Sequence, residues 1–197
     1  MLLNIKTKTG LLFGSFNPVH NGHILIARYM LNDEELDEIW FVVSPHNPLK
    51  ASNDLAPVSY RLAMLKIAIA SEPRFSICEL ELTMPTPSYT INTLKLLTKT
   101  YPGKDFSLII GADNLIELRL WKNYRQILRN FKILVYPRAG VSNIKLLQYP
   151  GVKITNAPMI DISSSTIRHM LDKGEDVLHL LPAGIADYIK LEQIYSL

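Results

Sequence analysis

The sequence has little of what disulfide-stabilised and membrane proteins need. Its 197 residues include one cysteine, Cys78, so no disulfide can form within the chain. A lone thiol is typical of proteins from a reducing compartment, and we expect a cytoplasmic protein. No uninterrupted apolar run approaches the roughly 20 residues that span a bilayer, and the N-terminus lacks the apolar segment of a secretory signal. The sequence therefore predicts no membrane association.

Charge of one sign is equally scarce. The 21 basic and 18 acidic residues give a net charge of +3 and form no basic stripe, so we predict no nucleic-acid partner. The small positive excess suits a small anionic ligand. No repeat, low-complexity tract or linker-like stretch divides the chain, and we expect residues 1–197 to form one domain.

Apolar runs alternate with segments of helical spacing along the whole chain. We expect strands at residues 11–13, 39–43, 75–82, 106–110, 132–136 and 152–155. We expect helices near 23–31, 58–70 and 90–98, between 111 and 128, and near 164–171 and 183–192. This order predicts an α/β fold, a doubly wound parallel sheet with helices on both faces and a C-terminal helical extension.

Polar clusters follow three of the expected strands. They are GSFNPVHNGH at 14–23, SPHNPLK at 44–50 and GADN at 111–114. Ligands of open parallel sheets bind beyond the carboxyl ends of the strands, where the strand order reverses. The three clusters therefore indicate one shared site.

The first cluster carries two histidines, His20 and His23, at the start of a helix. Residues three apart lie on one helix face, with Cβ atoms about 5–6 Å from each other. We expect Gly22 to let a ligand approach the backbone. Helix N–H groups with two imidazoles beside them suit a phosphate that gains charge in a transition state. The alternatives are two capping or surface histidines, or a zinc pair, which needs further ligands.

Two other motifs have polar groups suited to a nucleotide. The run ISSSTIRHML at 162–171 has more hydroxyls than one N-cap uses, and Arg168 one turn later can make forked contacts with phosphate oxygens. Asp113 in GADN either caps a helix or accepts hydrogen bonds from ribose hydroxyls.

Three further residues have both a structural and a functional interpretation. Thr90 in PSYTINTL is a natural N-cap. Trp121 either belongs to the core or, half-exposed, stacks on a flat heteroaromatic ring. Lys50 ends a loop that two prolines stiffen, and it either places a charge on phosphate or is solvated.

The motifs together resemble those of a known superfamily. G-S-F-N-P-V-H-N-G-H resembles the G-x-F-x-P-x-H-x-G-H signature of the HxGH nucleotidyltransferases, and I-S-S-S-T-I-R resembles their second signature, with Ser165 in the threonine position. PSYTINTL, IIGADNL with the following tryptophan, and LLPAGIADYI resemble the nicotinate-nucleotide adenylyltransferase branch. The resemblance covers residues 11–190.

The resemblance implies a single Rossmann-like nucleotidyltransferase domain. Its implied reaction joins ATP, with Mg²⁺, to nicotinate mononucleotide, giving nicotinate adenine dinucleotide and pyrophosphate in NAD biosynthesis. The mononucleotide phosphate attacks the α-phosphate of ATP directly, and no covalent enzyme intermediate forms.

The resemblance also implies which residues meet ATP. His20 and His23 contact the phosphates and the transition state, and Asp113 faces ribose hydroxyls. The implied ATP contacts are Gly14, Ser15, Phe16, His20, His23, Gly111, Asp113, Ser164, Ser165 and Arg168.

The implied contacts of the second substrate are Lys50, Thr90, Trp121 and Lys122. Trp121 stacks on the pyridine ring, Thr90 and amides near Trp121 bind the carboxylate, and Lys50 serves a phosphate. Two positions depart from the family pattern. His46 is separated from Lys50, and Lys122 follows the tryptophan where many members have an aromatic residue or histidine. We expect Lys122 to add favourable charge for the carboxylate.

Other functions remain open from the sequence. Nicotinamide mononucleotide and phosphopantetheine are alternative acceptors, and a nucleotide-binding sensor without catalysis is the alternative outside enzymes. No protein-bound metal is expected beyond the Mg²⁺ that accompanies ATP. The sequence leaves a homo-oligomer open.

Overall fold

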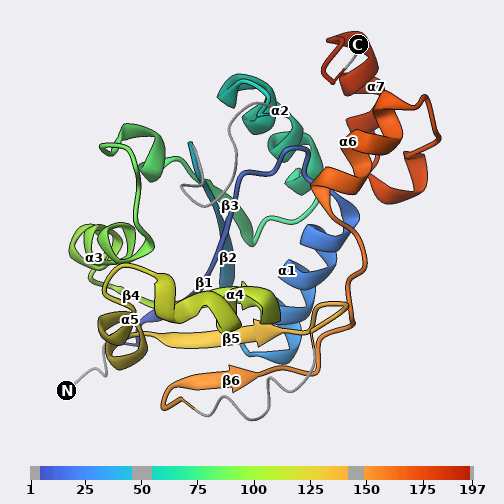
Figure 1. Ribbon diagram of the computed structural model, residues 1–197. Helices are drawn as coiled ribbons and strands as arrows, with labels where there is room; N and C mark the ends of the chain where they lie inside the picture. The colour runs from blue at the N-terminus through green and yellow to red at the C-terminus, as the bar shows by residue number, and fades with distance from the viewer. Residues whose placement is uncertain (1–4, 46–54, 142–148, 196–197) are drawn as a thin grey trace.

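The computed structural model describes residues 5–45, 55–141 and 149–195, and its centre is a six-stranded sheet (Figure 1). The strand order is β3-β2-β1-β4-β5-β6, and every pairing is parallel. This confirms the predicted doubly wound α/β fold. The strands are β1 (Thr7–Gly14), β2 (Glu38–Val43), β3 (Phe75–Cys78), β4 (Lys104–Gly111), β5 (Lys132–Tyr136) and β6 (Val152–Ile154).

Helices cover both faces of the sheet (Figure 1). On one side lie α1 (Asn21–Asp33), α2 (Val58–Ile69), α6 (Ser164–Asp172) and α7 (Ile185–Leu191). On the other side lie α3 (Thr90–Thr100), α4 (Ala112–Glu117) and α5 (Tyr124–Asn130). Short 3₁₀ helices are η1 (Leu80–Thr83), η2 (Leu118–Leu120) and η4 (Leu178–Leu180).

The central strands are apolar on both faces because each face meets a different layer of helices. Leu12 and Ile109 pack into the core beneath α1 and α2, whereas Leu11 and Leu108 pack beneath α3 and α5. These residues form two register pairs, Leu11 with Leu108 and Leu12 with Ile109. The strand order reverses between β1 and β4, so the edge at Gly14 and Gly111 is the expected place for a ligand.

One predicted strand is too long. The run at 75–82 was expected to be extended throughout, but β3 ends at Cys78 and residues 80–83 form η1. The cause is Glu81, which is buried and bonded to hydroxyls of residues outside the sheet. In the described part of the chain, no helix is long and apolar enough to cross a membrane.

The loops at the carboxyl edge of the sheet meet at one buried cation, Arg61 of α2, which is 0% exposed. Its Nη1 donates to the carbonyls of Ser15 at 2.7 Å and Ser44 at 2.9 Å. Its Nε donates to Ala56 at 3.0 Å, and its Nη2 donates to Pro45 at 3.3 Å. Burial lowers the pKa of Arg61, but an arginine remains charged in proteins. The guanidinium therefore ties the loops after β1 and β2 to the start of α2.

Removing this side chain should destabilise the fold strongly. Arg61→Ala leaves four carbonyls of the clamp without their donor, and we expect the free energy of unfolding to fall by about 3 kcal/mol or more. Urea unfolding followed by circular dichroism measures it. Arg74→Ala is the control, because Arg74 is exposed and bonds Glu72 two residues away. Equal stability of the two variants would contradict the stabilising role of the Arg61 hydrogen bonds.

Candidate functional site

The loop after β1 is packed against its own aromatic ring. Phe16 is 1% exposed, has a φ of 49°, and its ring lies edge-on to His23 at 5.1 Å between centroids. A Cβ at Gly14 would lie 2.9 Å from this ring. Gly14 is therefore required for the loop to close over Phe16, and only the backbone of Phe16 is left to meet a ligand.

The two histidines lie together, as predicted. His20 is the N-cap residue of α1, and His23 follows on the same first turn. Their rings stack with centroids 3.7 Å apart and an interplanar angle of 29°. The backbone N–H of His20 donates to Nδ1 of His23 at 3.2 Å. Since Nδ1 accepts, hydrogen bonding assigns the proton of a neutral His23 to Nε2, which makes Nε2 a donor.

His20 is a capping histidine, and it lies deeper than a surface histidine would. It is 3% exposed, and among the described residues its Nδ1 has no hydrogen-bond partner. Burial, assisted by the positive charge of Arg138, lowers the pKa of His20 to about 3. His20 is therefore neutral at physiological pH.

The interpretation of Gly22 as an opening for a ligand is wrong. A Cβ there would lie 2.6 Å from Cγ2 of Ile160 and 3.0 Å from Nδ1 of His20. The space beside Gly22 is filled by the protein, so this glycine lets the histidine turn pack against the chain before α6.

Helix α6 docks on the same loop through the second signature. Ser164 Oγ donates to the carbonyl of Pro18 at 2.9 Å, and Arg168 Nη1 donates to the carbonyl of Asn17 at 2.9 Å. The N-cap is Ser163, whose Oγ accepts from the N–H of Thr166 at 3.1 Å. Ser164 is therefore partly occupied in holding the two signatures together, whereas Ser165 is exposed.

Asp113 lies just beyond the end of β4, in the first turn of α4. Its Oδ2 is 3.9 Å from Nε of Arg138, beyond the end of β5. A Cβ at Gly111 would lie 2.3 Å from Asp113 Oδ1, so the glycine makes room for the carboxylate. Asp113 remains half exposed and available to a ligand.

A hollow of about 100 Å³ lies beside these residues. It combines the Arg138 cation and the Asp161 carboxylate with the hydroxyls of Ser163 and Thr166. Its lining residues are Arg138, Ala139, Ile160, Asp161, Ile162, Ser163 and Thr166.

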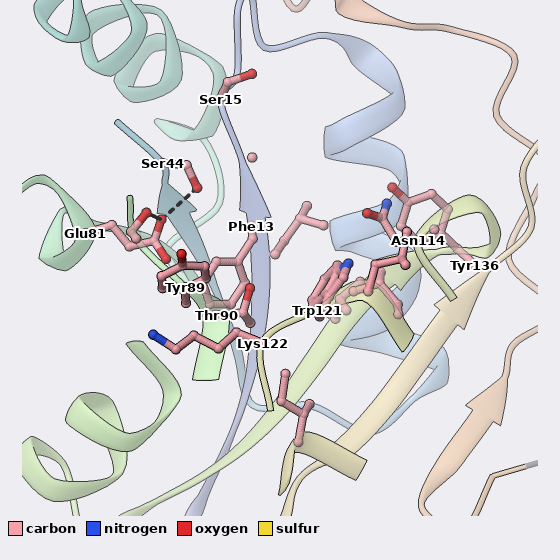
Figure 2. Close-up of a pocket in the computed structure, with 18 residues that line it drawn as sticks. Phe13, Ser15, Ser44, Glu81, Tyr89, Thr90, Asn114, Trp121, Lys122 and Tyr136 are labelled. Atoms are coloured by element: carbon pink, nitrogen blue, oxygen red, sulfur yellow. Dashed lines mark hydrogen bonds between the residues drawn. The ribbon is translucent and has the colours of Figure 1, made fainter. Parts of the chain in front are cut away.

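A larger cavity of about 190 Å³ opens at the carboxyl ends of β1 and β4. Figure 2 shows Glu81, Ser44, Tyr89 and Thr90 on one side of it and Trp121, Asn114 and Tyr136 on the other. The cavity brings together six of the predicted site residues, Gly14, Ser15, Thr90, Gly111, Trp121 and Lys122.

Two aromatic residues, Trp121 and Tyr89, form part of the wall of this cavity. Trp121 is half-buried and lines the cavity, while its Nε1 is buried and has no partner among the described residues. Lys122 Nζ lies 4.2 Å from the centre of the Tyr89 ring, a cation–π contact. Thr90 is the first residue of α3 rather than its N-cap, which is Tyr89.

Some functional candidates escaped the sequence interpretation. Glu81, Tyr136 and Arg138 line the two hollows but belong to no motif that was singled out. The signal for Arg138 was its place two residues after an expected strand.

His46 and Lys50 lie outside the described residues. In the described part of the chain, no group of three or more metal-binding side chains is found.

Comparisons with known proteins identify the relatives of this chain. Residues 11–170 match the cytidylyltransferase-like family. A "Probable nicotinate-nucleotide adenylyltransferase" from Bacteroides thetaiotaomicron is 43% identical over 185 residues, 94% of this chain and 92% of the relative. One from Bacteroides fragilis is 46% identical over 180 residues, 91% of this chain and 90% of the relative.

A solved structure shares the fold. It is the Plasmodium falciparum nicotinic acid mononucleotide adenylyltransferase complexed with NaAD. The TM-score is 0.82 at 20% identity, over 96% of this chain and 97% of that one.

The buried neutral His20 makes stability depend on pH. Below pH 6.5 the unfolded chain protonates this imidazole, whereas the folded chain does so only near pH 3. His20 alone should therefore lower the free energy of unfolding by about 1.4 kcal/mol per pH unit as the pH falls from about 6 to 4.

Urea unfolding at a series of pH values tests this, with His20→Asn as the variant. We expect His20→Asn to lose stability more slowly than the unaltered chain over this range. His169→Asn, on the exposed side of α6, should keep the original slope. The same slope in all three proteins would contradict a buried neutral His20.

Proposed function

We propose a division of roles in this site from the premise that the chain belongs to the nicotinate-nucleotide adenylyltransferases, within the cytidylyltransferase-like family. It joins ATP to nicotinate mononucleotide and gives nicotinate adenine dinucleotide and pyrophosphate, a step of NAD biosynthesis. One observation carries the division of roles. The aromatic-walled cavity opens at Gly14 and Ser15, on the same loop that presents His20 and His23.

The cavity is the proposed site of the mononucleotide. Trp121 stacks on the pyridine ring, and the N-terminus of α3 at Thr90 supplies N–H groups for the carboxylate. Lys122, above the Tyr89 ring, adds positive charge at the same wall. Lys50 is assigned to the phosphate from the sequence motif alone.

The hollow at Arg138 is the proposed site of the adenosine part of ATP. Asp113 lies beside it with an exposed carboxylate that accepts hydrogen bonds from ribose hydroxyls. Ser165 and Arg168 extend from α6 towards the leaving pyrophosphate, while Ser164 keeps α6 on the loop.

The reaction needs positioning more than bond-making by the protein. The phosphate of the mononucleotide attacks the α-phosphorus of ATP, the bond to the bridging oxygen breaks, and pyrophosphate leaves. His23 donates from Nε2 to phosphate oxygens as they gain charge. The stacked neutral ring of His20 and the bond from the His20 N–H hold the ring of His23 in one orientation.

The setting of the reaction is also part of the proposal. Mg²⁺ enters with ATP as the substrate complex, since Mg²⁺ is usually bound through substrate phosphates and few protein groups. Residues 1–197 act as one nucleotidyltransferase domain in the cytoplasm, and size-exclusion chromatography tests whether it assembles as a homo-oligomer.

Pyrophosphate release with ATP and Mg²⁺ tests the function. We expect turnover with nicotinate mononucleotide to exceed that with nicotinamide mononucleotide and phosphopantetheine. Lys122→Ala should narrow the preference for the nicotinate form, because it removes the charge at the wall. An unchanged preference for nicotinate over nicotinamide mononucleotide would show that the charge of Lys122 does not contribute to binding the carboxylate. Tight ATP binding without pyrophosphate release on any acceptor would instead support a sensor.

His23→Ala should lower kcat by roughly 100-fold or more, as loss of one preorganised transition-state donor does. Steady-state kinetics with both substrates saturating measures the effect, and circular dichroism establishes that the variant is folded. His179→Ala is the control, because its side chain is exposed on η4. A folded His23→Ala enzyme with full kcat would refute the assignment.

A further inference from the structure

A buried carboxylate, Glu81, lies in the wall of the larger cavity and belongs to none of the recognised motifs. It is 2% exposed and comes from η1, between β3 and α3. Its Oε2 accepts from Ser44 Oγ at 2.8 Å and Ser88 Oγ at 3.1 Å, and its Oε1 accepts from Thr93 Oγ1 at 2.7 Å. Three segments of the chain therefore converge on one side chain.

Among the described residues, the side-chain hydrogen bonds that this carboxylate accepts all come from hydroxyl groups. In the described part of the chain Glu81 forms no ion pair with a lysine, arginine or histidine. A buried charged group is costly unless hydrogen bonds satisfy it, and bonds from hydroxyls to an ionised carboxylate are stronger than neutral ones. The hydroxyl protons are thus committed to Glu81.

These hydrogen bonds determine whether the hydroxyls in the cavity wall can donate to a ligand or only accept from it. A serine hydroxyl has one proton to donate and two lone pairs to accept with. Ser44 and Ser88 both line the cavity and both donate to Glu81. Their oxygens therefore present only lone pairs to the cavity. Thr93 is 0% exposed and lies outside the lining, so its bond anchors the carboxylate from behind.

A pyridine mononucleotide has few groups that match such a wall. Its phosphate and its carboxylate are acceptors when ionised, so lone pairs repel them. Its ribose hydroxyls are the donors that remain. We propose that Glu81 is a positioning residue that sets Ser44 and Ser88 as acceptors, so that these two hydroxyls bind a ribose hydroxyl of the mononucleotide, while its carboxylate lies at the N-terminus of α3 on the same side of the cavity.

The inference rests on the proposed function and deepens it, because it assigns the orientation of the acceptor in the cavity. Trp121 is on the opposite side of the cavity from Glu81 and Ser44 in Figure 2. The ring and the ribose of one molecule would then contact opposite walls. Figure 2 also shows the hydroxyl of Ser44 directed at the carboxylate of Glu81.

Kinetics with 2′-deoxy and 3′-deoxy analogues of nicotinate mononucleotide tests the inference. For the unaltered chain, we expect kcat/KM to fall about tenfold with the analogue that lacks the bound hydroxyl, the loss of one hydrogen bond. Glu81→Gln places an amide NH₂ group against at least one of the hydroxyls. That hydroxyl then accepts a hydrogen bond from the amide, and its own proton points elsewhere. In this variant KM for the mononucleotide should rise about tenfold, with kcat and KM for ATP little changed. The deoxy penalty, which is the fall in kcat/KM on going from nicotinate mononucleotide to the deoxy analogue, should shrink to about twofold.

Two sets of variants keep the result interpretable. Glu79→Gln changes an exposed carboxylate two residues away and should keep both KM and the deoxy penalty. If Glu81→Gln does not fold, Ser44→Ala and Ser88→Ala replace it. Each deletes one acceptor oxygen, and the one that meets the ribose should abolish the deoxy penalty.

The outcomes separate the inference from the function. The unaltered chain could turn over nicotinate mononucleotide while the deoxy penalty persists in Glu81→Gln or in both serine variants. This result would overturn the role of Glu81 and leave the proposed function intact. Failure of the unaltered chain to release pyrophosphate with nicotinate mononucleotide would remove the proposed function and this inference with it.

Discussion

A single buried guanidinium is the constraint on which the site depends. Arg61 holds the backbone after β1 and after β2 through carbonyl oxygens, and Asn17 continues the same arrangement. The Asn17 Oδ1 accepts from the N–H of Ala56 at 3.0 Å and from the hydroxyl of Tyr195 at 2.6 Å. Segments from both ends of the chain therefore meet at the histidine loop. A loop fixed in this way keeps its N–H groups and imidazoles in place before substrate arrives, which is what electrostatic preorganisation requires.

The two hollows near the carboxyl edge of the sheet fit two substrates in the proposed division of roles. The larger one is walled by aromatic residues and by hydroxyls bonded to Glu81, and the smaller one carries Arg138 and the α6 segment. The topological reversal between β1 and β4 opens the sheet edge at Gly14 and Gly111. In the proposed division of roles, the phosphates of both substrates meet beside His23. Catalysis at such a site comes from bringing two anions together in line, and the protein supplies donors rather than a nucleophile.

Local sequence patterns predicted the strands, the α/β order and the residues that recur as motifs. The run 132–136 became β5 without change, and His20 and His23 lie together as their spacing predicted. What escaped prediction depends on partners far along the chain. Glu81 looked like the end of a strand. Its hydroxyl partners come from the residue after β2, the turn before α3 and α3 itself. Arg61 looked like one polar residue of an amphipathic helix, yet it bonds Ser15, 46 positions away. No local periodicity encodes such contacts.

The measurement that tests the central claim most directly follows the α-phosphate. The chain is incubated with Mg²⁺, nicotinate mononucleotide and ATP that carries radioactive phosphorus at the α-position, and the label is traced over one turnover. Direct in-line transfer predicts that the label moves into nicotinate adenine dinucleotide, in equal amount to the pyrophosphate released, and that none is found on the protein. Label bound covalently to the chain, or label that stays in ATP or AMP while the mononucleotide is unconsumed, would contradict the account.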